Sequence, residues 1–293
     1  MGQKLSISDV TFTDTTLPIL RDDLMLSSGS LFLWDPGHSL GTFTGIPIGG
    51  ASMPNVAWKE CASVLGSGTQ SSLSATVAVN SGTAANQFFL ERTPKGGIHG
   101  IVSQVGQTGA NQFILSAPAA VNTYVRTNKA HSFFWSAWWK VTRNTIGTGN
   151  AAPQSLMEFA DNTSAYIMYT SNGQFNGPGA PNGSVIGSRS PANPETTIAL
   201  GSACLVNGGT TGYNGAGPTA NFEFGVGNYG AWTGFNQNKS PSRILYRCYF
   251  EDLTVSGRTY AQCDAIDNAM FTAAFASGGK FFGDTYTAVS TLP

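Results

Sequence analysis

The chain has 293 residues, a net charge of −1 and 41% hydrophobic residues, which supply enough apolar material for a core and exclude a disordered protein. Only 11% of its residues are charged, and the 15 Lys and Arg residues form no basic run, so we expect no nucleic-acid partner. No apolar run approaches the roughly 20 residues of a membrane span, and the start of the chain lacks the apolar region of a secretory signal. We therefore expect neither a membrane partner nor secretion.

Residues 1–30 are predicted to form an extended N-terminal arm. They mix apolar residues with Thr and Asp without a helical period, and Pro18 would interrupt a continuous helix. An extended segment cannot bury its apolar side chains against itself, so we expect this arm to dock on another copy of the chain or on a neighbouring protein. The residues singled out for this contact are Phe12, Leu17, Ile19 and Leu20.

The remainder, residues 31–293, is predicted to be one β-sandwich. Short segments with period-two alternation predict strands at 31–38, 73–79, 99–105, 112–115, 131–142, 156–160, 165–170, 198–206, 221–226 and 244–251. The segments between them at 171–194, 207–219 and 227–242 are rich in Gly, Asn, Pro and Ser and are predicted loops. A short helix is predicted at 56–65. Many short strands with little helix favour an all-β sandwich.

Two of these strands and one helix have detailed predictions. Alternation in 131–142 places one set of side chains on one face: Phe133, Trp135, Ala137, Trp139 and Val141. In the C-terminal strand the same rule groups Ile244, Tyr246, Cys248 and Phe250, with Arg247 and Glu251 opposite. Thr259 and Gln262 then form a capping box that begins a helix within 259–277, and Gly278-Gly279 ends it.

The four cysteines at 61, 204, 248 and 263 form no C-x-x-C pair and have no histidine nearby in sequence, so they match no zinc site. Two of them fall on predicted apolar faces. We expect buried free thiols, with a disulfide as the alternative.

Several segments carry a resemblance to known families. Residues 133–140, Phe-Phe-Trp-Ser-Ala-Trp-Trp-Lys, resemble the F-x-I-S-x-W-x-K strand of laminin-G-like jelly rolls, and 246–271 resemble their last strand and helix. Residues 251–260, together with 281–286, resemble virion structural proteins of tailed bacteriophages. The resemblance implies a concanavalin A-like jelly roll with one short C-terminal helix. It also implies a structural role in the virion, as a tail, fibre or baseplate component or as a capsid decoration protein. The partners would be further copies of the chain, in a homo-oligomer, and other virion proteins.

We identify no catalytic residues, metal ligands or cofactor site in the sequence. A glycosidase needs two carboxylates in one cleft, but Glu158 and Asp161 have an odd spacing, and the adjacent Glu251 and Asp252 point to opposite faces. Of the three histidines, His99 and His131 border predicted strands and are interpreted as hydrogen-bonded edge residues. We therefore expect no enzymatic activity, and a carbohydrate-cleaving enzyme remains the third alternative, through carboxylates brought together only by the fold.

Aromatic residues in the Gly-rich loops define a second alternative function. Lectins of this architecture stack sugar rings on exposed aromatic side chains. The candidates for such contacts are Tyr213, Tyr229, Trp232 and Phe235. They would make the protein a glycan-binding module for host-surface attachment. The competing interpretation is that these rings pack beneath their own loops.

Overall fold

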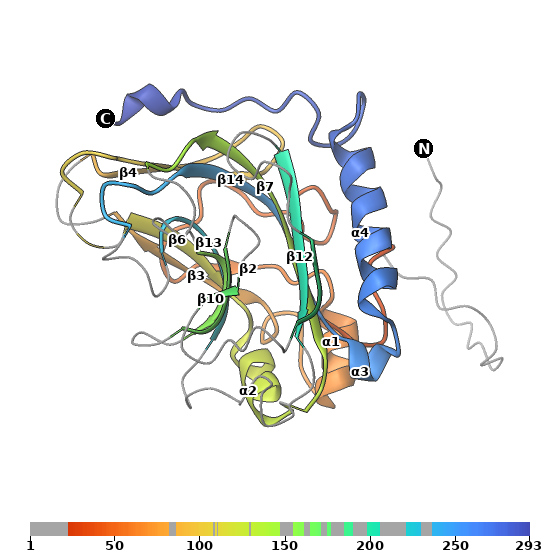
Figure 1. The fold of residues 1–293 in the computed structure, drawn as a ribbon. Coiled ribbons are helices and arrows are strands. Elements are labelled where there is room, and N and C mark those ends of the chain that lie inside the picture. Colours follow the sequence, from red (N-terminus) through yellow and green to blue (C-terminus); the bar gives the residue numbers. More distant parts are fainter. Residues whose placement is uncertain are drawn as a thin grey trace.

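A computed structural model of the chain contains two antiparallel β-sheets, with a long helix along the outside of one sheet (Figure 1). The residues that it describes are 23–81, 86–107, 109, 111–128, 130–146, 155–160, 165–170, 175–176, 185–189, 198–205, 221–229 and 236–293. Apolar side chains from both sheets meet in one buried core. The predicted all-β sandwich is confirmed.

Sheet A holds the C-terminal strand at its centre. Its strands, in spatial order, are β11 (Val185–Arg189), β12 (Ile198–Leu205), β7 (Phe133–Arg143), β14 (Ser242–Asp252), β5 (Ile98–Val102) and β4 (Phe88–Arg92). On one side β14 pairs with β7, and on the other it pairs first with β5 and then with β1 (Ser30–Trp34). Among the described residues, the first strand is thus hydrogen-bonded to the last.

Sheet B is the other layer of the sandwich. Its strands, in spatial order, are β10 (Phe175–Asn176), β9 (Ala165–Thr170), β8 (Ser155–Ala160), β13 (Asn221–Asn228), β6 (Asn111–Ser116), β3 (Ala75–Asn80) and β2 (Ser52–Met53). The predicted hairpin of 156–160 and 165–170 is present as the antiparallel pair β8 and β9.

Strand β7 confirms the alternation that the sequence predicts. Phe133, Trp135 and Trp139 lie in the core between the sheets, as do the smaller residues of the same face. The opposite face is also buried, because Phe134 and Trp138 pack in two smaller clusters beneath α4 (Tyr260–Phe275). Sheet A is therefore covered on both sides, and its outer cover is the predicted C-terminal helix, which begins with the Thr259 and Gln262 capping box.

In the C-terminal strand, the four residues that alternation placed on one face lie on two different faces. The register of β14 against β7 shifts between Leu245 and Arg247, so two residues of β14 oppose one residue of β7. This bulge reverses the alternation. Cys248 and Phe250 lie in the core between the sheets, but Ile244 and Tyr246 lie on the outer side against α4.

Several elements differ from the sequence prediction. The short helix predicted at 56–65 is α1 (Trp58–Leu65), but α2 (Ala119–Thr127) was not predicted, and α3 (Leu253–Ser256) precedes α4. The predicted C-terminal helix is α4 (Tyr260–Phe275), and the four residues of α3 are an additional helical turn before it. Strand β11 lies inside a predicted loop, and β4 was also missed. Among the described residues no helix is both long and apolar enough to cross a membrane.

The start of the folded body lies earlier than residue 31. Met25 is fully buried and Leu26 is 6% exposed, both in the cluster beneath α4. The carbonyl oxygen of Met25 accepts hydrogen bonds from the hydroxyl of Tyr249 at 3.0 Å and from the guanidinium of Arg258 at 2.7 Å. Residues 23–30 of the predicted arm thus pack on the folded body, and residues 1–22 lie outside the described residues.

All four cysteines are buried free thiols in the structure. Cys204 and Cys263 lie in the cluster beneath α4, whereas Cys61 and Cys248 lie in the core between the sheets. Burial raises the pKa of Cys61 and of Cys204 to about 12, so these thiols stay protonated and unreactive at neutral pH.

Candidate functional site

Most of the residues named from the sequence as candidate contacts lie outside the described residues. These are Phe12, Leu17, Ile19 and Leu20 of the arm and Tyr213, Trp232 and Phe235 of the loops. The exception is Tyr229, at the end of β13, which is only 1% exposed. Its ring lies flat on Gly225, where an added Cβ would come within 2.6 Å of it. Tyr229 packs against its own strand and is not a stacking surface open to solvent.

The outer face of sheet B carries a polar row that crosses five strands. Directly opposite residues of neighbouring antiparallel strands share a face, so the register determines which side chains lie side by side. Successive pairs join Ser52 to Thr76, Thr76 to Ser116, Ser116 to Glu223, and Glu223 to Glu158. We call these five residues the polar row. Their neighbours along each strand, such as Leu115 and Phe224, point into the core.

Two carboxylates stand next to each other in this row. Glu158 of β8 and Glu223 of β13 are directly opposite, which places their Cβ atoms about 5 Å apart. Glu158 is 3% exposed and Glu223 is partly exposed. The hydroxyl of Ser116 donates a hydrogen bond of 3.1 Å to Glu223. The search for carboxylate pairs along single strands missed this pair, because only the register of two strands brings the residues together.

Burial raises the pKa of Glu223 to about 7, although the hydrogen bond from Ser116 favours the ionised form. At neutral pH the side chain is therefore divided between its neutral and ionised forms. In the neutral form it both donates and accepts hydrogen bonds.

This shift predicts a pH-dependent effect of Glu223→Gln. Between the ordinary pKa of 4.5 and about 7, the native state keeps a proton that the unfolded chain has lost, so this group lowers stability as the pH rises. The full cost above pH 7 is on the order of 3 kcal/mol. Urea denaturation gives the free energy of unfolding of Glu223→Gln and of the wild type at each pH. The difference between the two should favour the variant more at pH 8 than at pH 5. An equal difference at both pH values would refute the shift, and Glu60→Gln on α1 controls for the loss of one carboxylate.

The hydroxyl of Tyr229 lies near the carboxylate pair. Gly225 and Glu223 are two residues apart on β13 and share its outer face, so the ring on Gly225 is beside Glu223. The pKa of Tyr229 is well above its usual value, because of burial first and then the charges of Glu158 and Glu223. The hydroxyl is thus a neutral donor, and it has no hydrogen-bond partner among the described residues.

A shallow hollow adjoins the polar row at the β2 edge of sheet B. Its volume is about 490 Å³, and it is lined by Ser52, Pro54, Thr69, Gln70, Ser71 and Ser74. Ser52 belongs to both the hollow and the row. The lining contains hydroxyl and amide groups and no charged side chain.

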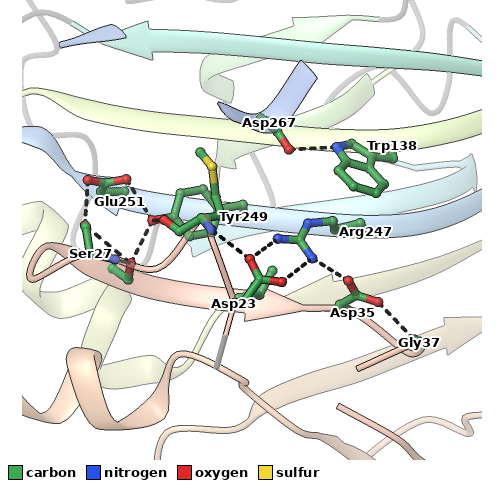
Figure 2. A network of polar contacts seen from close by, with 12 residues as sticks. Asp23, Ser27, Asp35, Gly37, Trp138, Arg247, Tyr249, Glu251 and Asp267 are labelled. Atoms are coloured by element: carbon green, nitrogen blue, oxygen red, sulfur yellow. Dashed lines mark hydrogen bonds and ion pairs between the residues drawn. The ribbon is translucent and has the colours of Figure 1, made fainter. Parts of the chain in front are cut away.

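A cluster of ion pairs lies on the opposite side of the molecule, between sheet A and its outer cover (Figure 2). Arg247 of β14 is 1% exposed and donates to Asp23 at 2.9 Å and to Asp35. Lys280, from the segment after α4, also pairs with Asp35. Burial alone would raise the pKa of Asp35, but the charges of Arg247 and Lys280 outweigh it and hold this pKa below its usual value. The cluster joins both ends of the described chain to the centre of sheet A.

A second group of contacts holds the same N-terminal segment. Glu251 accepts from Ser27 at 2.7 Å and from Tyr249 at 2.7 Å, and it pairs with Arg258 (Figure 2 shows Ser27, Tyr249 and Glu251). On the helix side, Asp267 of α4 accepts from the indole of Trp138 at 2.9 Å. These contacts explain why polar residues are tolerated beneath the helix, since hydrogen bonds offset the cost of their burial.

His99 and His131 are hydrogen-bonded, as expected, and His38 Nδ1 accepts from the Leu40 N–H at 3.1 Å. His99 Nδ1 lies 2.7 Å from Glu91 and its Nε2 lies 2.9 Å from the hydroxyl of Thr142. This order of carboxylate, imidazole and hydroxyl is that of a nucleophilic triad, but His99 is fully buried and Tyr286 packs edge-on against it at 5.2 Å. Thr287 donates to Glu91 twice, at 2.7 Å each. The group therefore fastens the C-terminal segment to sheet A.

His131 lies 2.6 Å from Asp252, whose other oxygen caps α3. No group of three or more His, Cys, Asp or Glu residues within the described part of the chain has the arrangement of a metal site.

No protein-family model matches this chain, and no curated protein is detectably similar in sequence. Among solved structures, a Trypanosoma rangeli sialidase aligns with 84% of this chain and 34% of its own, at 11% identity and a TM-score of 0.36. The binding domain of Paraclostridial Mosquitocidal Protein 1 aligns with 84% of this chain and 53% of its own, at 10% identity and a TM-score of 0.40. The chain thus spans about a third and about half of these proteins, and similarity at this level says nothing about ligand or activity.

Proposed function

We propose that the protein is a non-enzymatic structural component of a bacteriophage particle, held in place by the apolar residues of its N-terminal arm. Within the particle, the protein is a component of the tail, of a fibre or of the baseplate, or it is a capsid decoration protein. The partners of the arm are further copies of the chain and other virion proteins. Neither nucleic acid nor membrane is a partner.

The anchoring of residues 23–34 to the body carries this proposal. Asp23, at the end of the arm, is fixed by Arg247 at the centre of sheet A, and β1 pairs with β14 seven residues later. A force that pulls on the arm therefore acts on the central strand of sheet A and on its buried ion pairs. A flexible tail with no load to bear would not need these contacts.

The distribution of charge supports the same proposal. The chain has few charged residues, and several of them form ion pairs with one another beneath α4. The rest of the sequence is rich in Ser, Thr, Asn, Gln and Gly. Surfaces of low charge associate more readily than strongly charged ones, which suits a protein that stays within an assembly.

The exposure of the carboxylate pair supports a role without catalysis. In glycoside hydrolysis one carboxylate must reach the anomeric carbon while the other protonates the leaving oxygen. Glu158 is 3% exposed, so its carboxylate does not reach a substrate lying over the sheet.

Mass spectrometry of purified particles tests the proposal. We expect the chain to remain with particles of the phage that encodes it through a density gradient, at a constant ratio to the major capsid protein. Gold-labelled antibodies against residues 31–293 should then mark one part of the particle. Recovery of the chain only in the unassembled fraction of the lysate would overturn the proposal.

A further inference from the structure

Residues 284–293 form a strap that passes over sheet A from the end of α4 toward the β4 side (Figure 1). Apart from one short 3-10 helix (Val289–Thr291), the strap has no helix or strand. Among its side chains only Leu292 is buried. A segment that buries so little apolar surface depends on individual contacts, and it opens locally more easily than the sheet beneath it.

The strap is attached to sheet A at two places. At its far end, the guanidinium of Arg143 on β7 donates to the carbonyl of Leu292 at 2.8 Å, and the N–H of Gln104 donates to the carbonyl of Pro293 at 2.7 Å. Neither contact contains a group that titrates near neutral pH. The other attachment is the packing of Tyr286 on His99 together with the two hydrogen bonds from Thr287 to Glu91. It contains an imidazole, whose ordinary pKa lies close to neutrality.

The partners of His99 determine its protonation state at neutral pH. Burial alone would raise the pKa of Glu91, but the hydrogen bonds from His99 and Thr287 outweigh it and hold this pKa below its usual value. Glu91 is therefore ionised and accepts from Nδ1, which leaves Nε2 to accept from the hydroxyl of Thr142 at 2.9 Å. Burial lowers the pKa of His99 by more than Glu91 raises it, so the ring is neutral at pH 7.

Two further charged groups face the ring. The ammonium of Lys140 lies 4.6 Å from the centre of the Tyr286 ring, and its charge disfavours a protonated imidazole. Asp284 favours one, but its carboxylate also accepts from the N–H of Lys95 at 3.1 Å. On the β14 side, the residue directly opposite His99 is the uncharged Ile244.

A proton on Nε2 costs more when the strap is closed than when it is open. In the closed state Nε2 would become a donor that faces the Thr142 hydroxyl, and the charge would be fully buried beside Tyr286. With Tyr286 removed, water reaches the ring and Glu91 remains as its partner. The pKa of His99 is thus lower in the closed state, so the closed state loses stability as the pH falls through 6.5 toward this lowered pKa.

We propose that this attachment is a pH-sensitive latch: protonation of His99 detaches Tyr286 and Thr287 from sheet A, while the two sheets stay folded. The strand pairing of β14 with β5 and β7 involves no residue of the strap, so it survives the release. Release uncovers His99, Glu91 and Thr142 on the outer side of sheet A.

Hydrogen exchange in the full-length chain measures the opening constant of the strap. Mass spectrometry of short peptides covering 284–293 gives their exchange rate, which is divided by the rate of the unstructured peptide at the same pH. Between pH 7.5 and pH 5.0 we expect the opening constant to rise several-fold, and at most about thirtyfold for the uptake of one proton by a group with an ordinary pKa of 6.5. Peptides from β7 and β14 should stay protected at both pH values.

Two histidine variants form a matched pair. His99→Gln keeps a donor and an acceptor but cannot take up a proton, so we expect its strap to lose the pH dependence. His131→Gln makes the same change beside Asp252 and should keep the dependence of the wild type. If His99→Gln does not fold, Tyr286→Leu replaces it, because the loss of the ring exposes His99 in both states and should abolish most of the pH dependence.

A second pair separates the strength of the latch from its pH response. Thr287→Val removes one donor to Glu91 and should raise the opening constant several-fold at both pH values, whereas Thr285→Val changes an exposed side chain of the same strap and should leave it unchanged. A rise of less than twofold between pH 7.5 and pH 5.0, or an equal rise in the wild type and in His99→Gln or Tyr286→Leu, would overturn the proposal. These readouts need no particle and are independent of the assembly role.

Discussion

Replacement of Arg247 by methionine is expected to lower the free energy of unfolding by about 3–5 kcal/mol, since it leaves buried carboxylates without their cation. Asp35 is fully buried, and Asp23 loses both of its contacts with the guanidinium group. Lys280 remains as a partner of Asp35, but it is about one-third exposed and comes from the C-terminal segment. The loss is a large share of the 5–15 kcal/mol that stabilises an ordinary domain.

A triple variant separates the effect of the buried charges on stability from the effect of side-chain packing. Asp23→Asn and Asp35→Asn, combined with Arg247→Met, remove the buried charges together and should recover most of the stability lost in the single variant. Denaturant unfolding, monitored by tryptophan fluorescence, measures both. A loss below about 1 kcal/mol in Arg247→Met would show that the ion pairs do not hold the N-terminal segment.

The second large effect is expected from a comparison of two N-terminal deletions of different length. Deletion of residues 2–22 should leave the melting temperature close to that of the full chain, because the deletion stops before Asp23. Deletion of residues 2–30 should cost roughly 5 kcal/mol or more, because it also removes the buried Met25 and Leu26 and the Asp23 partner of Arg247.

The two deletions are each other's control, since they differ by eight residues. Differential scanning calorimetry would give a clear transition for the shorter deletion and a strongly lowered or absent one for the longer. Equal stability of the two variants would show that residues 23–30 do not stabilise the folded body.

The sequence predicted best where local pattern decides the structure. Alternation in 133–141 identified the core face of β7, and the Thr259 and Gln262 capping box identified the start of α4 within one residue. These features depend on side chains a few positions apart, so no knowledge of the rest of the chain is needed. The same is true of the 156–160 and 165–170 hairpin.

The errors concern features that depend on distant partners. The bulge before Arg247 is seen only in the register of β14 against β7, and no residue in 244–250 marks it. The segment 23–30 has no regular period, and it is ordered by contacts with Arg247, Tyr249 and Glu251 more than 200 positions later. The pairing of Glu158 with Glu223 likewise required the register of β8 and β13.

Incorporation of the 2–22 deletion variant into particles is the most direct test of the proposed assembly role. We expect the folded body to be retained in this variant, and with the fold verified by calorimetry a failure to assemble reports on the arm. A full-length variant with Phe12, Leu17, Ile19 and Leu20 all replaced by serine keeps the length of the arm and removes its apolar contacts. We expect both proteins to be folded and soluble and to be absent from purified particles, whereas the wild type is present. Normal incorporation of either variant would contradict attachment through the arm.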